Sequence, residues 1–290
     1  MLRKKRLLVW LLPLLLLGWL WWGNSSIQVS RLTVADAGLP VGLDGLVLAQ
    51  VSDLHNAEFG AGNAGLLARL AAEQPDVILL TGDLVDSRRT DIDAALDFAA
   101  GAVQTAPVYY VTGNHEMRLA ADGKLEELLT GLAAAGVTVL ANQAAALEYG
   151  KDVLWLAGLD DSSVNAGVVV DDTGSVEPLL PAEELSRLLG QCGGYTVLLA
   201  HRPEFFDLYA AVGANVVFCG HAHGGQWCLP GLGAVYAPGQ GLNPQYTEGV
   251  HQHGETRMIV SRGLGNSIFP LRVNNRPELV IVELVRVESQ

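Results

Sequence analysis

The sequence contains little cysteine and little positive charge, and both shortages exclude classes of protein. Its 290 residues include three cysteines, at positions 192, 219 and 228, with no CxxC pair. This argues against a complete disulfide framework and against a cysteine-liganded structural zinc. Lysine and arginine total 18 against 31 acidic residues, for a formal net charge of −13. Because nucleic-acid binding depends on basic contacts to phosphates, we expect no nucleic-acid partner.

Low-complexity segments and internal repeats are absent from residue 27 onward, and the one long hydrophobic run lies at the N-terminus. There, four basic residues at positions 3–6 precede an uncharged, leucine-rich run over 7–22 that ends in Trp19, Trp21 and Trp22. A basic flank, an apolar run and interfacial tryptophans are typical of a membrane anchor. We therefore expect residues 1–26 to form an uncleaved anchor helix, with a cleaved signal peptide as the alternative.

The basic cluster also predicts an orientation. The positive-inside rule keeps residues 3–6 in the cytoplasm, so we expect a single-pass protein of the cytoplasmic (inner) membrane. Its domain, residues 27–290, would then lie outside the cytoplasm. Hydrophobic residues make up 50% of the chain and charged residues 17%, which is enough apolar material for a large packed core.

Apolar runs of strand length alternate with helical patterns along this domain. The expected strands include an edge strand over 27–34 and buried runs over 46–51, 77–80, 108–111, 137–140, 153–159, 196–200 and 216–218. The expected helices cover 63–73, 92–104, 125–135 and 181–189. Continuous Val, Ile and Leu runs are typical of strands buried on both faces, so the pattern predicts an α/β fold with a largely parallel or mixed sheet.

Potential metal ligands follow five of these strands. They are Asp53, His55, Asp83, Asn114, His201, His221 and His223. In open α/β sheets, ligands bind outside the carboxyl ends of strands, and residues i and i+2 of an extended or tightly turned backbone can point the same way. We therefore expect these side chains to meet, with His221 and His223 directed to one spot.

Seven ligands are too many for one tetrahedral site, and they suit two adjacent divalent ions bridged by a carboxylate. Oxygen and imidazole ligands fit Mn, Fe, Zn or Co. Two ions about 3.5–4 Å apart can generate a hydroxide at neutral pH and clamp phosphate oxygens. The ions would supply the positive charge that the acidic chain lacks. His115, next to Asn114, is placed to protonate a leaving oxygen.

Five short motifs together resemble the calcineurin-like metallophosphoesterases. They are Asp53-x-His55, Gly82-Asp83-x-x-Asp86, Gly113-Asn114-His115-Glu116, Ala200-His201 and Gly220-His221-x-His223. The resemblance runs from Leu46 to the C-terminus. The tail, with Gly224-Gly225-Gln226 and 260–267, is similar to the membrane-anchored bacterial phosphodiesterase branch. It departs from that branch at 268–270, Val273 and Asn275, where we expect substrate preference to be affected.

The resemblance implies a four-layer αββα sandwich that carries a dinuclear metal site. By position in the motifs, Asp53, His55 and His223 would hold the first ion. Asn114, His201 and His221 would hold the second. Asp83 would bridge the two ions, and His115 would be the catalytic histidine beside the leaving group.

We expect hydrolysis of a phosphodiester or pyrophosphate bond by a hydroxide that bridges the two ions, on a membrane-proximal or lipid-linked phosphate ester. Tethering favours such a substrate because it raises the effective concentration of membrane-bound groups. One alternative is a protein Ser/Thr phosphatase-type monoesterase, which is disfavoured by the scarcity of basic residues to bind a dianion. The other is a non-catalytic, metal-bound membrane scaffold or sensor.

Several polar and aromatic residues near the motifs allow two interpretations. Asp86 orients a ligand or caps its loop, and Glu116 is a candidate partner for His115. Arg262 binds a substrate phosphate or forms a salt bridge. The pair His251-x-His253 is expected in a solvated loop rather than in a metal site. Trp227 contacts a base or an acyl chain of the substrate, or packs against the protein.

Overall fold

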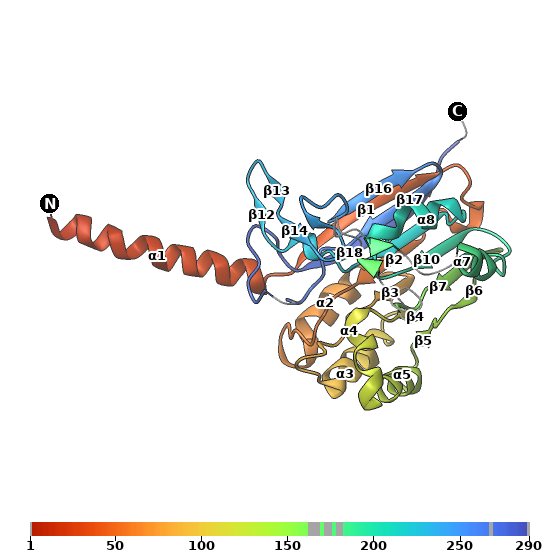
Figure 1. Ribbon diagram of the computed structural model, residues 1–290, viewed down its shortest axis with the longest axis horizontal. Helices are drawn as coiled ribbons and strands as arrows, with labels where there is room; N and C mark the ends of the chain where they lie inside the picture. Colours follow the sequence, from red (N-terminus) through yellow and green to blue (C-terminus); the bar gives the residue numbers. More distant parts are fainter. Residues whose placement is uncertain (1, 162–168, 171–175, 178–181, 267–268, 289–290) are drawn as a thin grey trace.

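Two six-stranded sheets form the centre of the molecule (Figure 1). The computed structural model describes residues 2–161, 169–170, 176–177, 182–266 and 269–288. Both sheets contain parallel and antiparallel neighbours, as the apolar runs predict.

The first sheet has the strand order β1-β18-β2-β3-β4-β5. Its strands are β1 Gln28–Asp36, β18 Glu278–Arg286, β2 Val47–Val51, β3 Val77–Thr81, β4 Val108–Val111 and β5 Thr138–Val139. Strands β2 to β5 run parallel, whereas β18 is antiparallel to β2 and parallel to β1. The edge strand expected over 27–34 is therefore confirmed as β1.

The second sheet has the order β16-β17-β11-β10-β7-β6. Its strands are β16 Gly249–His253, β17 Thr256–Val260, β11 Val216–Cys219, β10 Thr196–Leu199, β7 Asp152–Gly158 and β6 Gln143–Tyr149. The four inner strands are parallel, and β16 and β6 pair antiparallel at the edges. The loop expected around His251 and His253 is wrong, because both residues lie in β16 and their segment pairs with β17 through backbone hydrogen bonds.

Helices cover the outer face of each sheet. Their bounds are α2 Ala64–Ala72, α3 Ile92–Ala102, α5 Lys124–Ala134, α7 Ala182–Leu189 and α8 Phe206–Ala211. The short helix α4, Asn114–Met117, lies instead at the end of β4. The side chain of Asp91 accepts a hydrogen bond from the N–H of Ala94 and so caps the start of α3. The helix expected over 181–189 agrees with α7, and its predicted first residue, Pro181, lies outside the described residues.

The four layers follow from the alternation of side-chain direction along the strands. Successive side chains point to opposite faces of a sheet. In β3, Leu79 faces inward and packs with residues of the second sheet such as Leu156 and Phe218. Its neighbours Ile78 and Leu80 face outward and pack with residues of α2, α3 and α5. On the second sheet, outward-facing residues of β10 and β11 pack with α7 and α8. The result is the four-layer αββα sandwich.

Short hairpins extend the fold beside the second sheet. Their strands are β8 Val169–Val170, β9 Val176–Glu177, β12 Cys228–Leu229, β13 Gly233–Ala234, β14 Tyr236–Ala237 and β15 Gly241–Leu242. Figure 1 shows β12, β13 and β14 on the side of the molecule from which α1 leaves.

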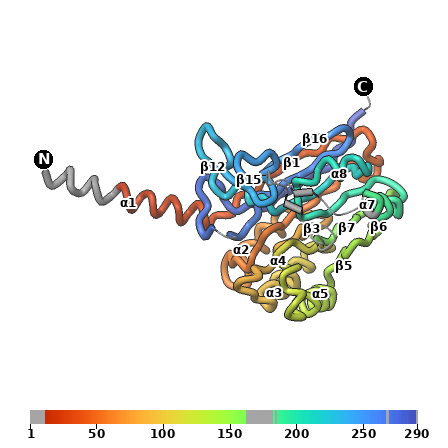
Figure 2. The backbone as a smooth tube through the Cα atoms, viewed as in Figure 1, coloured from red at the N-terminus to blue at the C-terminus, as the bar shows by residue number. Residues whose placement is uncertain are grey.

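Helix α1, Leu2–Ser25, extends away from the two sheets (Figures 1 and 2). Its leucines at positions 12, 14, 15, 16 and 17 are 53% to 66% exposed. Its last turn is attached to the domain through Asn24, which donates to the carbonyl of Arg272 and accepts from the N–H of Arg272. Within the described residues, no helix is both long enough and apolar enough to cross a membrane.

Candidate metal centre

Loops that follow β2, β3, β4, β10 and β11 converge at one edge of the sandwich and bring the predicted ligands together. All seven predicted ligands are buried. Two of the three-residue clusters with metal-compatible geometry are Asp53–His55–His223 and Asp83–His201–His221. Each of these clusters therefore draws its ligands from both sheets.

The first cluster brings donor atoms together at short range. His55 Nε2 and His223 Nε2 lie 3.2 Å apart, and His223 Nε2 lies 3.5 Å from Asp53 Oδ1. Facing imidazole nitrogens and a carboxylate in a buried site are a donor set that a divalent cation satisfies.

The second cluster is built in the same way and adjoins the first. His201 Nε2 lies 3.3 Å from Asp83 Oδ2 and 3.2 Å from His221 Nδ1. The same Asp83 oxygen lies 3.5 Å from His55 Nε2, in the first cluster. The amide oxygen of Asn114 is buried without a hydrogen-bond partner among the described residues. These residues therefore fit two neighbouring ions with Asp83 between them.

Hydrogen bonds behind the ligands fix their orientation. His201 Nδ1 lies 2.8 Å from the carbonyl oxygen of Thr81. The ring N–H therefore points to that oxygen, and the Nε2 lone pair is directed into the cluster. Asp53 accepts hydrogen bonds from the N–H of His221 and from the hydroxyl of Ser52.

Burial and charge perturb the ionisation of these groups. Burial raises the pKa of Asp53 to about 6 and lowers the pKa of His55 to about 3. Although burial acts in the opposite direction, the negative charge of Asp83 raises the pKa of His201 to about 10. The charge of His201 correspondingly holds the pKa of Asp83 well below its usual range. A proton on His201 thus neutralises Asp83, and metal binding would displace it.

Five of the seven ligands have left-handed backbone conformations, a feature that the sequence did not reveal. Asp53, His55, Asp83, His221 and His223 have φ angles between 48° and 63°. Such conformations cost about 1–3 kcal/mol each for residues other than glycine and gather at functional sites. The backbone at His221-x-His223 is therefore tightly turned, the second of the two expected conformations, and not extended. The two imidazoles belong to different clusters.

Glycine is required at position 220, where the loop after β11 packs against the loop after β2. A Cβ atom on Gly220 would lie 1.9 Å from Ser52 Oγ and 2.3 Å from Asp53 Oδ2. Any larger residue would therefore displace the carboxylate of Asp53, which explains the glycine of the Gly220-His221 motif.

Glu116 holds two ligand loops together. Its carboxylate accepts hydrogen bonds from the N–H groups of Asp83, Val85 and Gly113 at 2.7–3.1 Å. Burial raises the pKa of Glu116 to about 7. The sequence carries no signal for this role, because the motif shows only that Glu116 follows Asn114 and His115.

His115 lies beside the first cluster, with its ring edge-on to that of His55 at a centroid distance of 4.5 Å. The N–H of Ser87 donates to His115 Nδ1 at 3.1 Å, so the proton of the neutral ring is on Nε2. Asp86 Oδ1 lies 3.7 Å from the same Nδ1, and the Asp86 carboxylate is bound by Arg88 and Arg89. Asp86 therefore contributes both to its loop and to the surroundings of His115.

The remaining ambiguous residues are placed outside the two clusters. Arg262 forms a salt bridge with Glu278 at 2.9 Å. Trp227 is 42% exposed and packs near Phe269 with a ring-centroid distance of 5.7 Å. An ion pair that the sequence did not predict joins Arg202, which follows His201, to the buried Asp161 at 2.7 Å.

A four-layer sandwich with two adjoining clusters of candidate metal ligands at its strand ends defines the class of dinuclear metallohydrolases. The chain belongs to the calcineurin-like phosphoesterase family, whose model matches residues 46–225. Members of this family hydrolyse phosphate esters with two divalent metal ions, which agrees with the donor sets described above.

Two bacterial relatives are similar over most of their length. Phosphodiesterase YaeI of Escherichia coli is 31% identical over 81% of this chain and 80% of its own. The uncharacterized metallophosphoesterase YkuE of Bacillus subtilis is 29% identical over 89% of this chain and 85% of its own. Among solved structures, sulfate thiohydrolase SoxB of Thermus thermophilus has a similar fold, with a TM-score of 0.51 and 14% identity over 85% of this chain and 57% of its own.

Proposed function

We propose that the protein hydrolyses phosphodiester or pyrophosphate bonds with two divalent metal ions. The observation that carries this proposal is the position of Asp83 Oδ2, within 3.5 Å of an imidazole nitrogen from each cluster. A carboxylate in that position is suited to bridge two ions. The relative YaeI is named a phosphodiesterase, which supports the same reaction class.

Different residues of the chain would bind the ions, fix the loops and donate a proton. Asp53, His55 and His223 would hold one ion, and Asn114, His201 and His221 the other, with Asp83 shared. When bound, the two ions would activate water and neutralise charge on the phosphate oxygens. Glu116 fixes the backbone of the loops that carry Asp83 and Asn114. His115, whose Nε2 carries the proton, would donate it to the leaving oxygen.

The surroundings of the centre favour a diester over a monoester. A cavity of about 390 Å³ beside His55 is lined by Asn56, Arg89, Asp91 and Asn266 among others. The charges of Arg89 and Asp91 offset each other, so this cavity offers no excess of positive charge to a monoester dianion. A diester carries one charge fewer and is the better match.

An apolar cavity supports an amphiphilic substrate. It has a volume of about 410 Å³, begins at Gly225 and Gln226 just after His223, and is lined by Trp227, Leu242 and Phe269 among others. Such a lining suits an acyl chain attached to a phosphate at the metal centre. We include a lipid-linked or membrane-proximal phosphate ester in the proposal on this ground.

The first prediction tests the reaction with the full chain in detergent, stripped of metal by a chelator and reloaded with Mn²⁺. We expect hydrolysis of an aryl phosphodiester only after reloading, and faster than that of the matching monoester. A phosphodiester that carries a long acyl chain should show a lower KM than the aryl diester. His251→Gln, outside the centre, is the control and should behave as the parent does.

Two results would contradict the proposal. Faster hydrolysis of the monoester would favour the phosphatase-type alternative. Two bound ions per chain without turnover of any phosphate ester would favour the scaffold or sensor.

The second prediction concerns location. The proposal includes attachment of residues 1–26 to the cytoplasmic membrane with residues 27–290 outside, supported by the basic residues at 3–6 and the exposed leucines of α1. A reporter active only outside the cytoplasm, fused after Gln290, should be active. Activity confined to a cytoplasmic reporter at the same position would reverse the orientation.

A further inference from the structure

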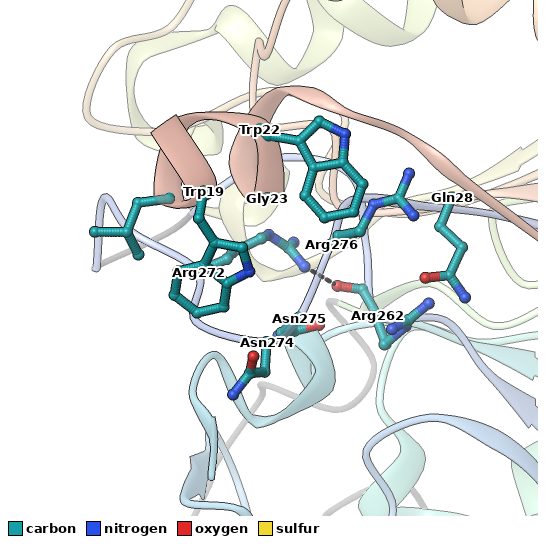
Figure 3. Close-up of a pocket in the computed structure, with 10 residues that line it drawn as sticks. Trp19, Trp22, Gly23, Gln28, Arg262, Arg272, Asn274, Asn275 and Arg276 are labelled. Atoms are coloured by element: carbon teal, nitrogen blue, oxygen red, sulfur yellow. Dashed lines mark hydrogen bonds between the residues drawn. The ribbon is translucent and has the colours of Figure 1, made fainter. Parts of the chain in front are cut away.

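A second polar cavity lies at the base of α1, on the side of the molecule where this helix joins the domain (Figure 3). Its volume is about 190 Å³, several times the roughly 30 Å³ that one water molecule occupies in the liquid. Three arginines, Arg262, Arg272 and Arg276, share its lining with Trp19 and Trp22. The cavity is therefore large enough for a phosphate group and lined with the side chains that bind one.

The positive charge of this cavity is only partly neutralised by the protein. Arg262 is paired with Glu278 and Glu248. Among the described residues, neither Arg272 nor Arg276 has a carboxylate within ion-pair distance. Arginines gathered without matching acids repel one another, and an anion between them relieves that repulsion. In a chain with a net charge of −13, this concentration of arginines is a local exception.

The guanidinium groups are also held in place before any ligand arrives. Arg272 is 2% exposed and donates to the carbonyl oxygens of Arg262 and Gly265 and to the side chain of Asn266. Its guanidinium also lies 3.5 Å from Nδ1 of the candidate ligand His223, so the cavity adjoins the metal centre. Arg276 donates to Ser26, and its guanidinium lies 4.5 Å from the centre of the Trp22 ring. Such fixed groups lose little entropy on binding.

The position of the cavity indicates where its ligand comes from. In Figure 3, the three arginines lie against the last turns of α1, whose tryptophans face them. Tryptophan is enriched at the level of lipid headgroups, and basic side chains near that level attract anionic lipids. Trp19 and Trp22 are exposed, and so are the leucines that precede them in α1.

We propose that this cavity is a binding site for a phosphate group, adjacent to the metal centre but distinct from it, and that the phosphate belongs to an anionic lipid headgroup. Arg272 and Arg276 contact the phosphate oxygens, and Trp19 and Trp22 lie along the adjoining part of the lipid. The site orients the domain on the membrane and takes no part in hydrolysis. The choice of a lipid over a free phosphate rests on the proposed attachment of α1 to the membrane.

The third prediction tests the site through the Tm of the full chain in neutral detergent micelles. A ligand that binds only the folded state raises the Tm. Phosphatidylglycerol at about 100 times its Kd should raise the Tm by about 5 °C. Phosphatidylcholine, which has no net charge, should not. Glycerol phosphate and inorganic phosphate test whether a free phosphate binds instead. A rise in Tm with either of them but not with phosphatidylglycerol would overturn the lipid assignment.

Variants separate specific binding from general effects of lipid. Arg276→Gln should abolish the rise in Tm, Arg276→Lys should retain most of it, and Arg31→Gln, an exposed arginine elsewhere on the first sheet, should retain all of it. Far-UV circular dichroism without ligand verifies that each variant is folded. No rise with any anion, or an equal rise in Arg276→Gln and the parent, would overturn the site.

The same variants distinguish this inference from the proposed function. Arg276→Gln should hydrolyse a soluble aryl diester as the parent does, because Arg276 contacts none of the ligands. If the parent hydrolyses no diester, the proposed function fails, whereas the Tm measurement still decides the phosphate site.

Discussion

Asp83→Asn is expected to lower the turnover of an aryl phosphodiester by about 10³-fold and to reduce bound metal below two ions per chain. Asp83 Oδ1 accepts a hydrogen bond from the N–H of His115 at 2.8 Å, so the asparagine would keep its carbonyl oxygen there. Its NH₂ group would replace Oδ2, facing His55 Nε2 and His201 Nε2. An amide nitrogen is a donor only and cannot bind a metal ion.

The magnitude follows from the shared position of Asp83. A metal ion contributes several kcal/mol to transition-state stabilisation, and each 1.4 kcal/mol or so corresponds to a factor of about ten. Loss of the common ligand weakens both clusters, so about three powers of ten is the expected scale.

Metal content by elemental analysis and the diester assay check this result together. Asp207→Asn is a matched control, because Asp207 is exposed and its described partner is His253, away from the centre. We expect the control to keep two ions and full turnover. Two ions and near-parental turnover in Asp83→Asn would show that the carboxylate does not bridge the ions.

The convergence of the ligands could be predicted because two local features agree, an apolar run of strand length and a polar motif directly after it. The apolar run 77–80 indicates a buried strand, and Gly82-Asp83 marks its end. The observed strand, Val77–Thr81, differs by one residue, which leaves Asp83 at the sheet edge. A strand that is buried on both faces has an uninterrupted apolar sequence. The end of the strand, and hence the position of Asp83, can therefore be predicted from the sequence.

The division of His221 and His223 between two clusters was not readable in that way. Spacing rules assume a regular backbone, whereas both residues have left-handed φ angles. Side-chain direction then depends on contacts that a local pattern does not contain. One such contact is the hydrogen bond from the N–H of His221 to Asp53, 168 residues away. The resemblance to the family placed the two histidines in separate clusters, where the spacing argument did not.

The cavity at the base of α1 could not be predicted from the sequence either, because it is formed by two segments that lie far apart in the chain. Its arginines come from a segment near the C-terminus, and its tryptophans from the N-terminal helix. The hydrogen bonds between Asn24 and Arg272 that join these segments span 248 residues of sequence. The sequence therefore pointed to Arg262 alone as a phosphate-binding candidate in that segment. Arg272 and Arg276 join it only through the fold.

His115→Gln is expected to lower turnover by about 10²–10⁴-fold while two metal ions remain bound, because general acid catalysis contributes on that scale. The N–H of Ser87 donates to His115 Nδ1 and leaves the proton on Nε2. Burial lowers the pKa of His115, so the ring is neutral near pH 7 and donates through Nε2–H. Glutamine fills similar space but its amide is a far weaker acid.

The dependence on the leaving group separates this role from a structural one. A nitrophenolate leaves without much help from an acid, whereas an alkoxide needs a proton as the bond breaks. His115→Gln should therefore impair hydrolysis of an alkyl diester more than that of a nitrophenyl diester, with metal content unchanged. His251→Gln is the control and should alter neither rate. Equal losses for both leaving groups would mean that His115 positions the centre and does not deliver the proton.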